Sequence, residues 1–243
     1  FTNQPHREWF YRQAYEMGFH PIGYEVQKVI ALIDWLERVG VNKAGVAGYG
    51  EGGLIALYAA ALEPRIQSTE VSGYFGPRER LWEEPIYRNV FGLLEQFGDA
   101  ELASMIAPRQ LIVEYSEVPK VSGPPSAREG HGGAAPGKLT TRERHEVEAQ
   151  VNRAREVFPA KFPAQFELVH GQEGSPVPPG SPKSIRFVVE KLGGKYSPER
   201  KQAPAKLSEI EVEERQRRQV QELVDYTQHQ ITRAERHRDH DHQ

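Results

Sequence analysis

Apolar residues recur with helix-like and strand-like spacing between positions 22 and 194 of the chain. Short apolar or alternating runs predict four strands, at Ala44–Ala47, Ile66–Ser72, Gln110–Tyr115 and Gln165–Val169. The first is short enough for a buried strand. Runs with three- and four-residue steps predict helices at Ile22–Val39, Leu54–Leu62, Asp99–Ile106, Thr140–Phe158 and Lys183–Leu192. This alternation predicts an α/β fold with a mostly parallel sheet flanked by helices.

Capping residues and breakers set the expected ends of these elements. Asp99 is the expected N-cap of one helix, and Thr140 or Thr141 that of the next. Pro182 precedes the last helix of this region. Residues 116–138 are rich in Gly, Pro and Ser, which predicts a long surface loop.

The chain divides into four expected parts. Residues 1–21 do not look like a natural domain start and are interpreted as the remnant of an upstream region, and 22–194 form the α/β domain. Residues 195–206 are expected to be a linker and 207–243 a long C-terminal helix. The helix has a thin apolar stripe, made of Leu207, Ile210, Val220, Leu223, Val224 and Ile231. It is either a solvated terminal helix, which the thin stripe favours, or a contact with a partner or another part of the full-length chain.

Composition narrows the possible functions. A net charge of −3 over 243 residues gives no general indication of nucleic-acid binding. No apolar run approaches the roughly 20 residues needed to cross a bilayer. Cysteine is absent, so disulfides and thiolate metal sites are excluded, and no cofactor or metal is expected. The location of the protein stays open, since an export signal would lie upstream.

The glycine-rich turn at positions 48–53, Gly-Tyr-Gly-Glu-Gly-Gly, follows the first predicted strand and precedes a helix. Strand, tight turn and helix form the frame of the G-x-S-x-G nucleophile elbow, with Gly48 and Gly52 as its outer glycines. Gly50 stands where the nucleophile belongs. Two alternatives remain: an ordinary strand–helix connection, and a dinucleotide site, since Gly48, Gly50 and Gly53 match G-x-G-x-x-G. The dinucleotide hypothesis is weaker because the acid at the right distance, Glu70, lies inside a predicted strand.

The order of segments resembles the C-terminal half of an α/β-hydrolase. After the elbow come Glu63-Pro64-Arg65-Ile66, a strand ending in Ser72-Gly73, a lid-like segment, and Ala107-Pro108-Arg109 before another strand. The likeness covers roughly Ile22–Gly194 and is greatest to the dienelactone hydrolase and acetyl xylan esterase-like branches. It implies a small ester or acetylated glycan as partner. It also implies that the N-terminal strands of the fold, with one oxyanion-hole N–H group, lie upstream of Phe1.

The resemblance also assigns positions to a catalytic triad. Gly50 takes the nucleophile position but has no side chain to attack with. The acid position falls on Glu117, with Glu114 as runner-up, and the base position on His170, slightly earlier than in the family. Glu117 could equally be a solvated loop carboxylate, and His170 the hydrogen-bonded end of a strand. Glu51 has less weight, although the start of a helix favours a carboxylate there.

Three hypotheses about function follow. The first is a degraded, non-catalytic hydrolase-like domain that binds a small ester or glycan or contributes to a larger protein. The second is an active hydrolase in which Glu117 or Glu51 activates water and the N–H groups after Gly50 stabilise the oxyanion. The third is an interaction module that uses the C-terminal helix.

Overall fold

The computed structural model describes residues 2–157, 165–198 and 211–241, with side chains up to position 236. It divides into two compact units, the first ending at Tyr196 and the second starting at Ser197. Most of the predicted linker, from 199 to 206, lies outside the described residues, as do 207–210 at the predicted start of the C-terminal helix.

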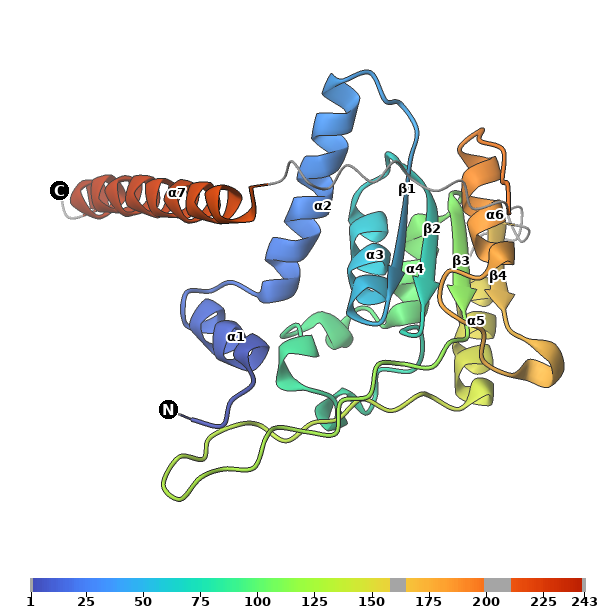
Figure 1. The fold of residues 1–243 in the computed structure, drawn as a ribbon, viewed down its shortest axis with the longest axis horizontal. Coiled ribbons are helices and arrows are strands. Elements are labelled where there is room, and N and C mark those ends of the chain that lie inside the picture. The colour runs from blue at the N-terminus through green and yellow to red at the C-terminus, as the bar shows by residue number, and fades with distance from the viewer. Residues whose placement is uncertain (1, 158–164, 199–210, 242–243) are drawn as a thin grey trace. The chain divides into compact units, whose positions relative to one another are not determined.

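Four parallel strands form the sheet of the first unit, in the order β1-β2-β3-β4 (Figure 1). Their bounds are Ala44–Tyr49 for β1, Ile66–Ser72 for β2, Gln110–Glu114 for β3 and Phe166–Val169 for β4. The register pairs Gly48 with Val71 and Ser72 with Glu114, so the carboxyl ends of β1, β2 and β3 meet at one edge. The predicted α/β fold with a parallel sheet is confirmed.

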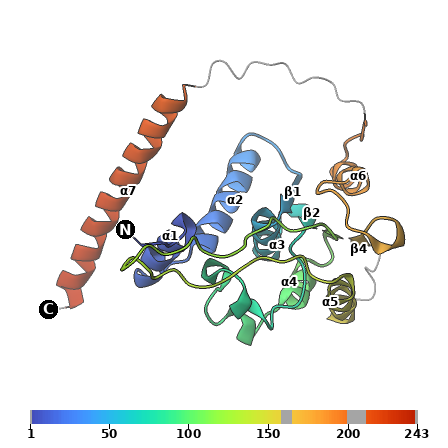
Figure 2. The same cartoon turned by 60° about the horizontal axis from the view of Figure 1, so that its bottom comes forward.

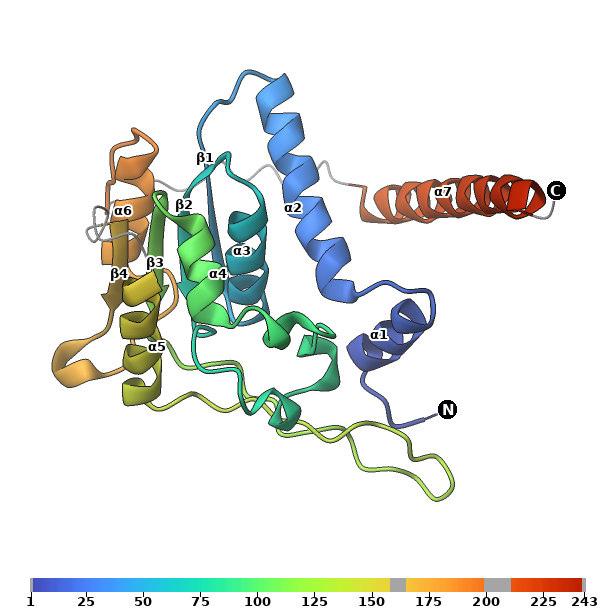
Figure 3. The ribbon, with the colours of Figure 1, turned by 180° about the vertical axis from the view of Figure 1, so that it is seen from behind.

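Helices cover both faces of this sheet. One face carries α3 (Glu51–Leu62), α4 (Asp99–Ile106) and α5 (Arg144–Val157), and the other carries α6 (Pro182–Lys191), as Figures 2 and 3 show. The helix α2 (Pro21–Arg38) packs against α3, and α1 (His6–Glu16) lies beside α2. The apolar core lies mainly between the sheet and α3–α5, with fully buried side chains that include Leu54, Leu57, Ile66, Leu111 and Phe166.

The expectation that the first strand is buried is wrong. In the described residues β1 pairs with β2 alone, and Gly45, Ala47 and Tyr49 are exposed, whereas every residue of β3 is buried. An apolar run fits a buried strand equally well, so sequence pattern alone cannot distinguish an edge from a centre.

One predicted helix start and one predicted N-cap are also wrong, although the predicted bounds of α4 are confirmed. The helix predicted from Thr140 begins at Arg144, because the Thr141 hydroxyl accepts a hydrogen bond from the Val118 N–H instead of capping a helix. For α4 the N-cap is Gly98 rather than Asp99, and the Glu101 carboxylate accepts the Gly98 N–H at 2.9 Å.

Two long segments cross the carboxyl end of the sheet. Residues 73–98 contain the short 3₁₀ helices η1 (Leu81–Glu83), η2 (Ile86–Arg88) and η3 (Leu93–Glu95). Residues 115–143 connect β3 to α5 and include the loop predicted for 116–138, and Figure 2 shows the two arms of this connection running side by side toward α1. The tip of the loop contacts the N-terminal segment, where Asn3 N–H donates to His131 O and Ala135 N–H donates to Glu8 Oε1. The strand ends are therefore covered.

The second unit consists of the helix α7, Val212–Asp241. Its described apolar side chains are exposed, among them Val220, Leu223, Val224 and Ile231. Within the described parts of the chain, no helix has the length and apolar character that crossing a membrane requires.

Candidate functional site

The turn between β1 and α3 has the geometry of a strained elbow. Gly50 has φ 57° and ψ −116°, which is close to the first central position of a type II′ turn, at roughly +60° and −120°. Its N–H donates to Ser72 O at 2.9 Å, and its carbonyl accepts from Leu54 N–H at 3.1 Å. A positive φ of this kind favours glycine, so the sequence at this position suits the turn.

The strand and the helix approach each other closely at this elbow. A Cβ on Gly48 would fall on the carbonyl of Gly52, and one on Gly53 would lie 3.0 Å from Ser72 O. A Cβ on Gly52, by contrast, would meet nothing within 4 Å. Packing thus requires a glycine at position 48 and leaves little room for a side chain at position 53.

The long loop covers the point from which a nucleophile would project. A Cβ built on Gly50 lies 3.0 Å from both Cγ and Cδ of Pro119. The Tyr49 hydroxyl fixes the loop there by donating to Glu117 O at 2.8 Å. The cleft beside this cover, lined by Gly73, Glu114 and Ser116 among others, has a volume of about 20 Å³, which is room for one water molecule.

The predicted acid and base positions are both exposed. Glu117 is exposed, and its described hydrogen bond is made by its carbonyl, which accepts from the Tyr49 hydroxyl. The His170 ring lies 2.9 Å from the carbonyl of its neighbour, Gly171. No hydrogen bond or ion pair joins Glu117, His170 and Gly50 among the residues described. Their catalytic roles stay predictions.

Glu51, the first residue of α3, takes part in ion pairs. Its Oε1 accepts from Arg88 Nε at 2.5 Å, and its Oε2 lies 3.7 Å from Arg7 Nη2. These contacts fasten the elbow to the segment above it and to α1. A general-base role for Glu51 also stays a prediction.

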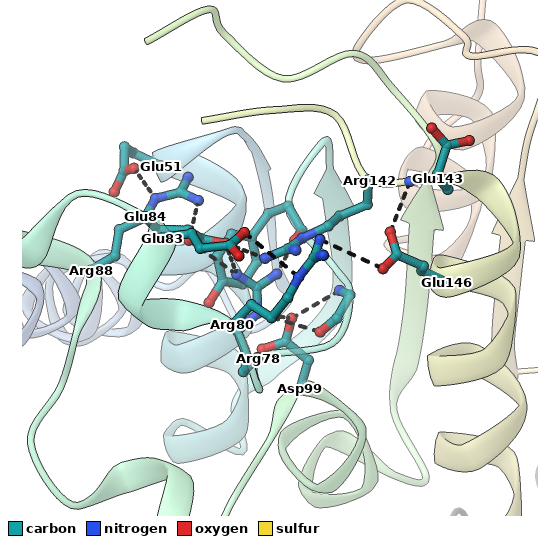
Figure 4. Close-up of polar contacts among 12 residues, drawn as sticks. Glu51, Arg78, Arg80, Glu83, Glu84, Arg88, Asp99, Arg142, Glu143 and Glu146 are labelled. Carbon is teal, nitrogen blue, oxygen red and sulfur yellow. Dashed lines mark hydrogen bonds and ion pairs between the residues drawn. The ribbon is translucent and has the colours of Figure 1, made fainter. Parts of the chain in front are cut away.

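Buried charged side chains of the 73–98 segment form a network beside the elbow. The Glu84 carboxylate accepts from Arg78 at 3.1 Å, from Arg88 at 2.8 Å and from Arg142 at 2.6 Å (Figure 4). Burial raises the pKa of Glu84, but the three guanidinium charges outweigh it and leave that pKa below its usual value. Arg78 also binds Asp99 at 3.0 Å. The network ties the lid-like segment to α4 and to the long loop.

A second buried polar cluster lies under α6. Glu114 accepts hydrogen bonds from the N–H groups of Gly180 and Ser181, each at 2.9 Å, and its side chain faces Glu70 on the neighbouring strand. Burial and the nearby Glu114 raise the pKa of Glu70 to about 8. Neither position had been expected to hold a buried carboxyl pair, because the two residues are far apart in the chain. A glutamate inside a predicted parallel strand was the available signal.

The largest cleft described here lies between η1 and the long loop. It has a volume of about 510 Å³ and is lined by Trp82, Glu83, Pro124, Pro136, Lys138 and neighbouring small residues. The Trp82 side chain is 77% exposed. The Lys138 N–H donates to Glu83 O at 3.0 Å, and a Cβ on Gly137 would lie 2.6 Å from Glu84 O, so the two walls are joined.

No protein-family model, curated protein or solved structure matches this chain. Across the described ranges, no group of three or more His, Asp or Glu side chains could hold a metal ion.

Proposed function

We propose that this chain is an α/β-hydrolase-like domain that binds a small ester or acetylated glycan without hydrolysing it. One observation carries the proposal: position 50 has no side chain, and Pro119 lies 3.0 Å from where one would start. Acyl transfer through an enzyme nucleophile needs an oxygen or sulfur atom at that point, with a base in hydrogen-bond reach.

The likeness to the hydrolase fold is supported by several independent features. Four parallel strands follow each other in chain order, and the turn after β1 has the strained backbone and the close Gly48–Gly52 approach of a nucleophile elbow. An ordinary strand–helix connection requires neither the positive φ of Gly50 nor a glycine at position 48.

The cleft beside Trp82 suits the ligand better than the covered elbow does. Its volume of about 510 Å³ lies in the range of small-molecule sites, whereas the cleft beside the covered elbow, at about 20 Å³, has room for one water molecule only. The exposed indole of Trp82 offers a flat apolar face to the C–H side of a sugar ring. Glu83 and Lys138 offer an acceptor and a donor to its hydroxyl or acetyl groups.

Two measurements test this function. The purified chain should show no turnover of a simple aryl acetate above the buffer rate, and measurable enzymatic turnover contradicts the proposal. An acetylated xylo-oligosaccharide should change the tryptophan fluorescence and should bind at least tenfold more weakly to Trp82→Ala. Trp35→Phe, which changes an exposed indole on α2, is the matched control and should bind like the parent.

We also propose a second role, as an interaction element, for α7. Its exposed stripe of Val220, Leu223, Val224 and Ile231 offers an apolar face that no other described residue of its unit covers. Deleting residues 207–243 should lower the assembly state measured by light scattering. If the full chain and the truncated chain have the same number of subunits, this role is contradicted.

A further inference from the structure

Two glutamates of neighbouring strands meet in the interior of the first unit. Glu70 on β2 and Glu114 on β3 are each 2% exposed. The Glu114 carboxylate is well supplied with donors: the N–H groups of Gly180 and Ser181, and the nearby hydroxyls of Ser72 and Ser184. One carboxyl oxygen of Glu70, Oε2, has no hydrogen-bond partner.

The donors to Glu114 belong to the start of α6. Gly180 and Ser181 precede Pro182, the first residue of the helix, so the Glu114 carboxylate anchors its N-terminus to the sheet. Ser184 is the fully buried residue of the helix itself, and the apolar Ile185, Phe187, Val188 and Val189 are half-buried. None of these apolar side chains is fully buried, so the anchor at Glu114 is the buried contact that holds the start of α6.

The described groups that act on Glu70 and Glu114 are polar or anionic, so none of them neutralises the charge of the pair. The polar side chains that act on Glu114 are Ser72 on β2, Ser181 just before α6 and Ser184 on α6. The nearest charged contact between α6 and the sheet is Lys183 with Glu167 on β4, at 3.4 Å on the surface. Glu114 is the charged side chain that shifts the pKa of Glu70.

We propose that α6 is a pH-sensitive latch, closed while Glu70 is protonated and donates to ionised Glu114, and loosened when both carboxyl groups are charged. One proton between two adjacent carboxylates gives Glu114 a further donor and avoids two like charges in a buried site. Loss of that proton leaves two negative carboxylates that repel each other. Movement of the start of α6 into water relieves this repulsion. The loop that carries His170 ends at α6, so the latch also controls this loop.

Proton linkage sets the expected pH dependence. In the opened, hydrated state Glu70 has an ordinary pKa of roughly 4.3, whereas in the closed state its pKa is about 8. Between these values opening releases one proton, so the opening equilibrium constant should rise about tenfold per pH unit. Above about pH 8 it should level off.

Hydrogen–deuterium exchange of the full chain between pH 6 and 9 tests the latch. Protection is read from peptides covering residues 178–192 and corrected for the intrinsic pH dependence of exchange. The parent should show the tenfold rise per unit up to about pH 8. Glu70→Gln, whose amide can still donate to Glu114, should show an opening constant independent of pH.

Glu167→Gln is the matched control, since it removes a surface carboxylate that also contacts α6; it should follow the parent. An opening constant of the parent that does not change with pH, or a Glu70→Gln variant that keeps the parent's slope, overturns the proposal. A readout that needs no variant is the ¹³C shift of the glutamate carboxyl carbons in the parent. One resonance should titrate near pH 8, and the absence of any titration above pH 6 also overturns it.

Discussion

The ring of Pro119 lies 3.0 Å from the position at which a side chain on Gly50 would begin. The two residues are far apart in the chain, and the bond from the Tyr49 hydroxyl to Glu117 O holds them together. The long loop thus occupies the space in which an elbow nucleophile would meet its substrate.

Restoring the nucleophile should not restore hydrolysis. Gly50→Ser places a side chain at a φ of 57° and against Pro119, which should lower the free energy of unfolding by about 1–3 kcal/mol. Aryl acetate turnover should stay at the buffer rate, because Glu117 and His170 are not brought together. Adding Pro119→Ala removes both contacting ring carbons and should recover part of the stability. Turnover by either variant would show that a base and acid are poised after all.

The close approach at the elbow gives a sharper test of the backbone geometry. Gly48→Ala puts a methyl group onto the Gly52 carbonyl and should cost about 3 kcal/mol or prevent folding. Gly52→Ala has open space and a helical position, so it should be neutral or slightly stabilising, by at most about 1 kcal/mol. Urea unfolding of both variants measures the difference. Equal stabilities would mean that strand and helix lie further apart than described.

The strands and the elbow were predictable because their signals are local. The run Ile66–Ser72 was predicted with both ends correct, and Gly48–Gly53 indicated a tight turn before a helix. The start of α5 was missed because the competing partner of Thr141, the Val118 N–H, lies more than 20 residues away. Local capping rules cannot include such a partner.

The burial of charged residues could not be predicted from the sequence for a similar reason. Arg78, Glu84 and Arg88 lie in a polar, aromatic stretch that predicts a surface excursion, yet all three are buried. Their burial is possible because Glu84 pairs with both arginines. Arg142, which comes from the long loop, also pairs with Glu84. The same holds for Glu70, whose partner Glu114 lies on the next strand.

Removing the centre of the charge network should be strongly destabilising. Glu84→Gln leaves the buried guanidinium groups of Arg78, Arg88 and Arg142 without their shared carboxylate, which should cost about 3–5 kcal/mol. Glu83→Gln is the matched control: its side chain is partly exposed and lies 3.6 Å from Arg80, so the change should stay below about 0.5 kcal/mol. Chemical unfolding at neutral pH compares the two. Similar losses would place Glu84 at the surface.

The carboxyl pair under α6 should also make global stability depend on pH. Glu70 has a folded-state pKa of about 8, above its unfolded value, so the folded protein holds an extra proton between roughly pH 4.3 and 8. Its contribution is fully present below the unfolded pKa and is lost as pH rises, by about 1.4 kcal/mol per unit. Glu114 acts in the opposite direction: hydrogen bonds outweigh burial and lower its pKa, so its contribution is lost in acid.

Glu70→Gln should therefore gain on the parent as pH rises. The difference in the free energy of unfolding should grow between pH 5 and 8 and stay constant above, because the parent then unfolds without releasing a proton from Glu70. Urea unfolding at one-unit pH steps measures this difference, with Glu167→Gln as a surface control that should show no such trend. A difference that is constant from pH 5 to 9 would mean that Glu70 is ionised in the folded protein throughout, and that Glu114 does not share its proton.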